Sequence, residues 1–130
     1  MFRAITHDIE VRVTPVYRED ESNPDAGRWF WAYTVEIFNG GSRAVQLLSR
    51  RWVITDANGT VQEVEGAGVV GMQPMIAVDE RFEYTSGCPL PTSSGFMQGE
   101  YHMVDEAGEA FDVVIPAFAL DLPNVIRILN

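Results

Sequence analysis

A glycine-rich segment offers the most suggestive chemistry in the sequence. Residues 66–71 read Gly-Ala-Gly-Val-Val-Gly, which matches the G-x-G-x-x-G pattern of dinucleotide-binding turns. In such sites the pattern follows a strand and opens a helix whose N-terminus holds a pyrophosphate. Here Pro74 follows three residues after Gly71, and no helical period comes after it. We therefore favour a loop that needs positive φ and close backbone approach over a phosphate-binding turn.

Three further side chains could ligate a soft metal or pair a nucleophile with a base, and they are His7, Cys88 and His102. A closed zinc site needs about four ligands at short spacings, which these scattered residues do not supply. No spacing ties Cys88 to His102, and the many carboxylates show no focus for acid–base chemistry. We therefore expect no catalytic residue, no metal centre and no cofactor, and we interpret the chain as non-enzymatic.

The run Trp29-Phe30-Trp31 places large rings on both faces of one expected strand. Such a strand is either covered by another segment or in contact with a partner. We favour a loop or the C-terminal tail folded over Phe30. The alternative is a surface for self-association or for a partner protein, with the aromatic rings as anchors.

The net charge of the chain restricts the classes of partner that it could bind. Its 130 residues include 19 Asp and Glu against nine Arg and no Lys, a formal net charge of −10. This acidity disfavours nucleic acid and anionic membranes, and it suits basic patches on other proteins. A single cysteine excludes an internal disulfide and fits a reducing compartment. Because the sequence has no signal-peptide pattern and no stretch of ~18 apolar residues, we expect a cytoplasmic protein without membrane insertion.

Alternating apolar and polar residues predict strands rather than helices. Asn58-Gly59 is a strong hairpin signal, and Pro15 indicates an edge position or a bend in the first strand. Loops are expected at 66–79 and 86–96, and the tail after Leu120 could form a short helix or a docked extension. The pattern predicts an all-β fold, a seven-stranded antiparallel β-sandwich of two sheets. Its strands are expected near residues 5–17, 29–38, 44–55, 61–64, 82–84, 97–103 and 111–115.

In such a sandwich alternate loops meet at the same end. The glycine segment 66–71 would then share an end with the turns at 39–42 and 105–109. An acidic field there opposes a polyphosphate unless a metal bridges it. We favour a solvated acidic rim, with a weak Mg²⁺ site as the alternative. The carboxylates concerned are Asp79, Glu80, Asp105, Glu106 and Glu109.

Several motifs together carry a family likeness: Gln46–Arg50, Trp52, Ile54–Asp56, Gly66–Pro74, Phe82–Cys88 and Gly95–Met103. Over residues 45–123 they resemble the ApaG family, and the N-terminal strands also fit. The resemblance implies a fibronectin type III-like (immunoglobulin-like) fold, an association with cobalt and magnesium efflux, and a neighbourhood of diadenosine polyphosphate metabolism. Related domains inside larger eukaryotic proteins imply interaction or ligand recognition. Arg51 departs from the family, which often has His there.

We therefore expect one ApaG-like domain over residues 1–130, with its core at about 4–122 and an extension at 123–130. The leading hypothesis is a binding module for a protein partner, with a homodimer as one form of that partnership. The alternative is a binder of pyrophosphate, a diadenosine nucleotide or Mg²⁺ through the glycine segment. The expected contact surface combines the loop at 87–95 with Gly66, Gly68, Val69, Gly71, Pro74, Trp29, Phe30 and Trp31.

Overall fold

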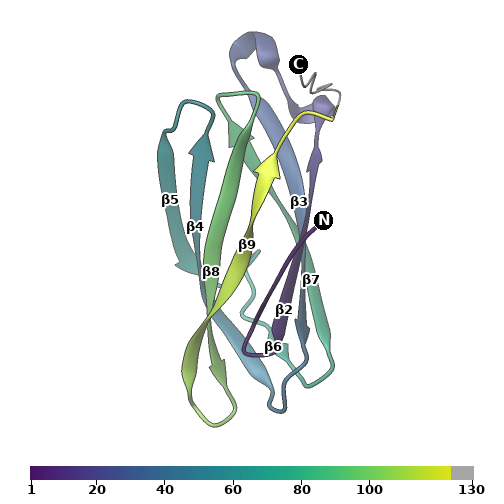
Figure 1. Cartoon of the computed structure of the whole chain (residues 1–130), viewed down its shortest axis with the longest axis vertical. Coiled ribbons are helices and arrows are strands. Elements are labelled where there is room, and N and C mark those ends of the chain that lie inside the picture. Colours follow the sequence, from purple (N-terminus) through teal and green to yellow (C-terminus); the bar gives the residue numbers. More distant parts are fainter. Residues whose placement is uncertain (124–130) are drawn as a thin grey trace, which may run out of the picture.

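The computed structural model describes residues 1–123 and consists of two antiparallel sheets packed face to face (Figure 1). The sheet orders are β1-β2-β3-β7 and β5-β4-β8-β9, and the short β6 pairs with the start of β4. The predicted antiparallel sandwich is confirmed, with nine strands over the described residues in place of seven. The strands are β1 (Phe2–Thr6), β2 (Ile9–Tyr17), β3 (Trp29–Asn39), β4 (Val45–Asp56), β5 (Val61–Ala67), β6 (Met75–Ile76), β7 (Arg81–Leu90), β8 (Gly95–Asp105) and β9 (Ala110–Leu120).

The single strand predicted over 5–17 is wrong, because this segment is a hairpin. β1 ends at Thr6 and β2 begins at Ile9, with His7 and Asp8 in a two-residue turn at φ 48° and 64°. Since Thr6 pairs with Ile9, the turn reverses which parity faces inward. Ile5 is therefore 56% exposed while Ile9 is buried. The even spacing of apolar residues continues across the turn and conceals it in the sequence.

Two prolines fit their strands because each lies at an edge. Pro15 pairs with Tyr33 of β3 and lies beyond the part of β2 that β1 covers, which ends at Val13. This confirms the expected edge position. Pro89 lies inside β7, which continues to Leu90, so the loop expected at 86–96 is only a short turn over 91–94. β7 is the last strand of its sheet, where a residue without an N–H is tolerated.

Aromatic rings fill the centre of the sandwich. The ring of Tyr33 on β3 lies 5.4 Å from that of Trp52 on β4 and 5.8 Å from that of Phe118 on β9. The inward face of β3 consists of Trp31, Tyr33 and the alternate residues that follow, which are all buried. Within residues 1–123 the helical segments are two short 3-10 turns, and no helix there is long and apolar enough to cross a membrane.

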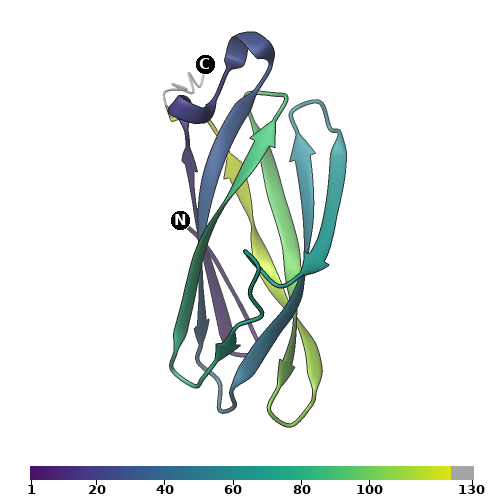
Figure 2. The ribbon, with the colours of Figure 1, turned by 180° about the vertical axis from the view of Figure 1, so that it is seen from behind.

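The two long sides of the sandwich differ. On one side β9 packs against β1 and β2, and the Val114 amide donates a hydrogen bond to Thr6 Oγ1 at 3.1 Å. On the other side β7 faces β4 and β5, and the two-residue strand β6, paired with the start of β4, is the strand element of the connection between β5 and β7. Figure 2 shows residues 68–74 running along this side, from the end of β5 toward β6. We call these the closed side and the open side.

Candidate functional site

The glycine segment forms a tight turn. The Val69 amide donates to the Met72 carbonyl at 2.8 Å, and the Met72 amide donates to the Val69 carbonyl at 2.9 Å. Between them Val70 and Gly71 have φ of 44° and 79°, as in a type I′ turn. Gly68 has φ 63°, and a Cβ on it would lie 2.2 Å from the Met72 carbonyl oxygen. The expectation of positive φ with close backbone approach is confirmed, and the next element along the chain is the strand β6 rather than a helix.

The turn lies along the open side rather than at the acidic end of the sandwich. Ala67, the last residue of β5, pairs with Ser49, whereas Asp105 pairs with Val45 at the start of β4. The expectation that residues 66–71 share an end with the 105–109 turn is therefore wrong. The reason is that β5 is much shorter than β4 and stops beside the middle of it.

The acidic residues at that end act within turns. The Asp105 carboxylate accepts hydrogen bonds from the amides of Ala107 and Glu109 and pairs with Arg43 at 3.4 Å. The hydrogen bond from the Glu109 amide is the largest cause that lowers the Asp105 pKa, and the hydrogen bonds from the Ala107 amide and Arg43 lower it further. Glu106 accepts from the Ala44 amide. Over residues 1–123 no group of three or more His, Cys, Asp or Glu residues is placed to hold a metal ion.

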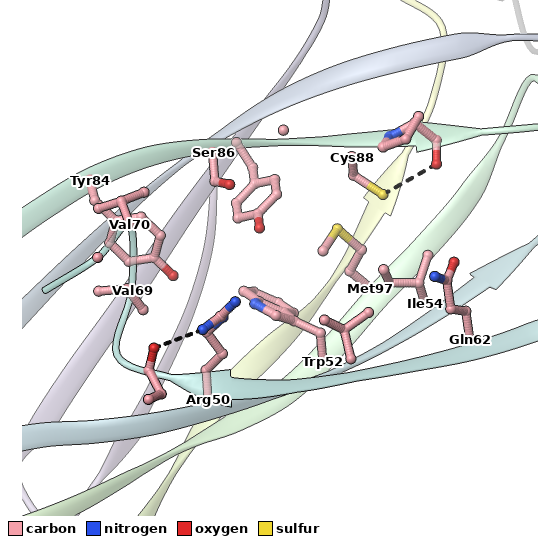
Figure 3. Close-up of a pocket in the computed structure, with 16 residues that line it drawn as sticks. Arg50, Trp52, Ile54, Gln62, Val69, Val70, Tyr84, Ser86, Cys88 and Met97 are labelled. Atoms are coloured by element: carbon pink, nitrogen blue, oxygen red, sulfur yellow. Dashed lines mark hydrogen bonds between the residues drawn. The ribbon is translucent and has the colours of Figure 1, made fainter. Parts of the chain in front are cut away.

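A pocket of about 500 Å³ opens between β7 and the pair β4–β5 (Figure 3). Aromatic and aliphatic side chains make most of its wall, and hydroxyl, amide and thiol groups lie among them. No Asp or Glu lines it, and Arg50 is its one cation. The lining residues are Tyr33, Arg50, Trp52, Ile54, Gln62, Val64, Ala67, Val69, Val70, Gly71, Tyr84, Ser86, Gly87, Cys88, Pro89 and Met97.

A bulge in β4 turns Arg50 into this pocket. Leu47 pairs with Met103 and Ser49 pairs with His102, so Leu48 is an extra residue opposite β8. Odd-numbered residues such as Leu47 face the core before the bulge, and even-numbered residues such as Trp52 face it afterwards. The Leu48 carbonyl accepts hydrogen bonds from the Gly68 amide and from Gln73 Nε2, both at 2.8 Å. The bulge is thus tied to the glycine turn.

Arg50 and its neighbour Arg51 differ in the groups that their guanidinium ions contact. Arg50 Nη1 donates to the carbonyl oxygens of Ala67 and Gly68 at 3.0 Å each, and no carboxylate of residues 1–123 lies within 4 Å of its guanidinium. Arg51 points outward and pairs with three carboxylates, at 2.7 Å from Glu63, 3.6 Å from Glu65 and 3.4 Å from Glu100. Sequence reasoning missed Arg50. The change of apolar parity between Leu47 and Trp52 was the signal that could have found it.

The other ionisable groups of the pocket are neutral at physiological pH. Burial raises the pKa of the Tyr33 and Tyr84 phenols, and it outweighs the opposing hydrogen bonds with Ser86 and Tyr101 and the smaller effect of the Arg50 charge. Tyr84 also shares a hydrogen bond, hydroxyl to hydroxyl, with the buried Tyr101. Burial raises the pKa of the Cys88 thiol to about 11. Arg50 therefore carries the only charge among the side chains that line the pocket.

Of the sequence-predicted residues in the glycine segment, Gly66 and Gly68 contact Arg50 directly. A Cβ on Gly66 would lie 2.6 Å from Arg50 Nη1, so this glycine leaves room for the guanidinium. Val69 is buried against the core, and Gly71 lines the pocket rim. Pro74 is buried, and its carbonyl accepts the Leu47 amide at 3.1 Å.

The aromatic run lies apart from this pocket. Trp31 is buried, and its indole Nε1 donates to the Asp121 carbonyl at 2.9 Å. The half-buried ring of Phe30 covers Gly87 of β7, where a Cβ would lie 2.2 Å from it. The glycine on the next strand thus provides the space for this ring, while the expected tail from residue 124 onward lies outside the described residues. Trp29 is also half-buried and does not line the pocket.

The three scattered ligand candidates do not come together. The His7 ring packs edge-on against Phe111, and His102 contacts Asp112 on the outer face of β8. Cys88 is buried on β7, and its one hydrogen bond within residues 1–123 is to the Pro89 carbonyl. The structure pairs Cys88 with no base in the described part of the chain.

Comparison with known proteins places this architecture in a family. Residues 19–105 match the ApaG domain (DUF525), a range that contains every residue lining the pocket. The chain is 58% identical over 130 residues to a protein named ApaG from Bradyrhizobium sp. (strain ORS 278), with both chains fully covered. It is equally similar to ApaG from Xanthobacter autotrophicus (strain ATCC BAA-1158 / Py2). A crystal structure of an ApaA protein from Bordetella pertussis superposes with a TM-score of 0.88 at 51% identity, covering 92% of this chain and 98% of that one.

Proposed function

The chain belongs to the ApaG domain family, and from this premise we propose that it is a non-enzymatic binding module for a protein partner. The observation that carries the proposal is a cluster of exposed apolar side chains between β5 and β7. Four of the ten exposed large hydrophobic residues among residues 1–123 lie within 70–78. We call them the apolar strip: Val70 (56% exposed), Met72 (52%), Met75 (61%) and Val78 (42%).

The strip has the properties of a contact surface. Clustered apolar side chains that include methionine are enriched at interfaces and sparse elsewhere on protein surfaces. The backbone beneath the strip is held by the paired amides of Val69 and Met72, and β6 anchors Met75 to Gln46. A surface that is already ordered loses little conformational entropy on binding, which favours affinity. The net charge of −10 suits a partner with a basic rim.

The state of Cys88 supports a non-enzymatic role. A nucleophilic cysteine needs a thiolate and access, and the thiol here is 2% exposed with its pKa raised to about 11 by burial. The cobalt and magnesium efflux association implied by the family resemblance would, in this proposal, act through the bound partner.

A second candidate function is the binding of pyrophosphate or a diadenosine nucleotide, with or without Mg²⁺, and the charge of Arg50 favours it. The glycine turn itself supports it less. A phosphate-binding loop presents free backbone amides to the ligand, whereas the amides of Gly68, Val69 and Met72 already donate to carbonyl oxygens within the fold.

Site-specific photo-crosslinking in cells tests the protein-binding proposal. A photoreactive amino acid replaces Met72 in the strip or, as a matched control, Val114 on the outer face of β9; both residues are 52% exposed. We expect a discrete adduct from position 72 that disappears when Met75→Glu is added, and no such adduct from position 114. Its mass would distinguish a second copy of this chain from another protein. Identical adduct patterns from both positions would contradict the proposal.

A further inference from the structure

We infer that the pocket between β7 and β4–β5 is a binding site for a small organic carboxylate, an anion with one charge on an apolar or aromatic body. This inference concerns the pocket, whose lining shares Val70 with the apolar strip, and it does not depend on the protein partner proposed for the strip. Charge, hydrogen-bond capacity and shape point to the same class of ligand.

Charge is the first argument. In a chain of net charge −10, a pocket lined by sixteen residues with no carboxylate and one guanidinium is locally positive. Every other lining group that titrates is a phenol or a thiol, which is neutral at pH 7 already, and burial raises the pKa of Tyr33, Tyr84 and Cys88 further. A single cation balances one negative charge. A pyrophosphate carries several and would need further cations or a metal.

The hydrogen bonds of Arg50 are the second argument. Nη1 is held by the carbonyl oxygens of Ala67 and Gly68, which fixes the plane of the guanidinium. Nε and Nη2 donate to no protein acceptor among residues 1–123, and the side chain lies in the pocket beside Trp52 (Figure 3). The free N–H donors at Nε and Nη2 match the two oxygens of a carboxylate. Such charge-assisted hydrogen bonds are about twice as strong as neutral ones.

Shape and lining are the third argument. Trp52 and Ile54 from β4 face Cys88 across the pocket, with Met97 of β8 between them (Figure 3). These groups form an apolar floor next to the guanidinium. A volume of about 500 Å³ is within the ordinary range for sites that enclose a small organic molecule. Ser86 and Gln62 add two polar groups that could orient the ligand.

The test uses 3-phenylpropionate as the probe carboxylate, 3-phenylpropanol as its uncharged counterpart, and pyrophosphate with and without Mg²⁺. Binding to the full chain is followed by NMR, through the indole N–H signals of Trp29, Trp31 and Trp52. We expect 3-phenylpropionate to shift the Trp52 signal saturably, with a dissociation constant of about 1 mM or tighter. We expect the alcohol to bind at least about tenfold more weakly, a difference of ~1.4 kcal/mol.

Variants separate the pocket cation from its neighbour. Arg50→Gln is expected to weaken 3-phenylpropionate binding by about tenfold or more, whereas Arg51→Gln on the outer face leaves it unchanged. Arg50→Lys keeps the charge and loses the planar pair of donors, so it should fall between the two; it also serves if Arg50→Gln does not fold.

The same titrations can overturn the inference. It fails if the alcohol binds as tightly as the carboxylate, since the pocket is then merely apolar. It fails if Arg50→Gln and Arg51→Gln behave alike, or if no saturable shift of Trp52 appears. If pyrophosphate shifts Trp52 and 3-phenylpropionate does not, the second candidate function replaces it. None of these results bears on crosslinking at position 72, so the two proposals stand or fall separately.

Discussion

The closed and open sides of this sandwich are built from the same kinds of strand but end in opposite ways. On the closed side the N-terminal hairpin brings β1 against β9, and the ring of Phe2 packs 6.1 Å from that of Phe118. On the open side β5 stops short, and a turn with three positive-φ residues, Gly68, Val70 and Gly71, leads toward β6. The comparison teaches that the pocket lies on the side where the two sheets do not close on each other, and we expect the packed closed side to carry more of the stability than the hollow open side.

The largest predicted effect contrasts core side chains on the two sides. Phe118→Ala on β9, the closed-side strand whose ring reaches the centre of the sandwich, should lower the free energy of unfolding by about 3–5 kcal/mol, because it leaves a large cavity among the rings of Phe2, Tyr33 and Trp52. Val69→Ala on the open side removes two methyl groups and should cost about 1–2 kcal/mol. Urea unfolding followed by tryptophan fluorescence measures both. Equal losses would show that the open side carries as much of the stability as the closed side.

A smaller effect is predicted for two glycines in the open-side turn. Gly68→Ala places a Cβ 2.2 Å from the Met72 carbonyl oxygen at a φ of 63°, so we expect a loss of about 1–3 kcal/mol. Gly71→Ala has a similar φ but no atom within 4 Å of the new Cβ, and should cost about 1 kcal/mol or less. Thermal unfolding of the pair isolates the steric contribution. If the two variants are equally stable, close backbone approach is not what requires Gly68.

The pH dependence of stability should also differ between the sides. Tyr33, Tyr84 and Cys88 on the open side have raised pKa values in the folded state, so the unfolded chain releases their protons first as pH rises. We expect the free energy of unfolding to fall above about pH 9, through the Cys88 pKa of about 11 and beyond. Urea midpoints at increasing pH measure this. Tyr84→Phe should flatten the slope, and an unchanged slope would contradict the assignment.

Acid should act on the hairpin of the closed side. Burial alone would raise the pKa of Glu10, but hydrogen bonds from Arg3 and Arg12 outweigh it and lower the pKa. The stability that this carboxylate contributes is present above its unfolded pKa of about 4.3 and is lost as pH falls through the lower folded value. Glu10→Gln should remove that part of the acid dependence while leaving the alkaline slope intact. The same urea series checks it.

The smallest effect is predicted for Arg51. Its partners Glu63 and Glu65 are more than half exposed, and ion pairs between exposed side chains contribute little to stability. Arg51→Gln should therefore leave the urea midpoint of unfolding almost unchanged. A clear drop in that midpoint would mean that the outer face of β4 also stabilises the fold.

The sequence was sufficient for the fold because alternation acts locally. The inward residues of β3, from Trp31 to Ile37, follow a strict period of two, and no turn interrupts them. The same rule failed at His7 and Asp8, where a two-residue turn preserves even spacing while exchanging the faces. Period alone cannot separate a straight strand from a hairpin with such a turn.

The candidate site was only half predictable. The glycine pattern marked the turn, and its missing helix argued correctly for positive φ over a nucleotide-binding helix start. The position of this turn along the sandwich depends on where β5 ends. That end is set by the pairing of Ala67 with Ser49 and not by any local sequence pattern. Arg50 was overlooked because it stands next to Arg51, and the sequence does not indicate which of the two arginines faces inward.

The extra residue at Leu48 makes β4 intolerant of length change. Removing or adding one amino acid there would exchange the faces of every later residue in the strand, sending Arg51 inward and Trp52 toward water. Chains related to this one could therefore vary the side chain at this position freely, yet should keep the residue count between the β3–β4 turn and Trp52 fixed. Counting residues in that interval is a cheap way to recognise which homologues can hold a cation inside the sandwich.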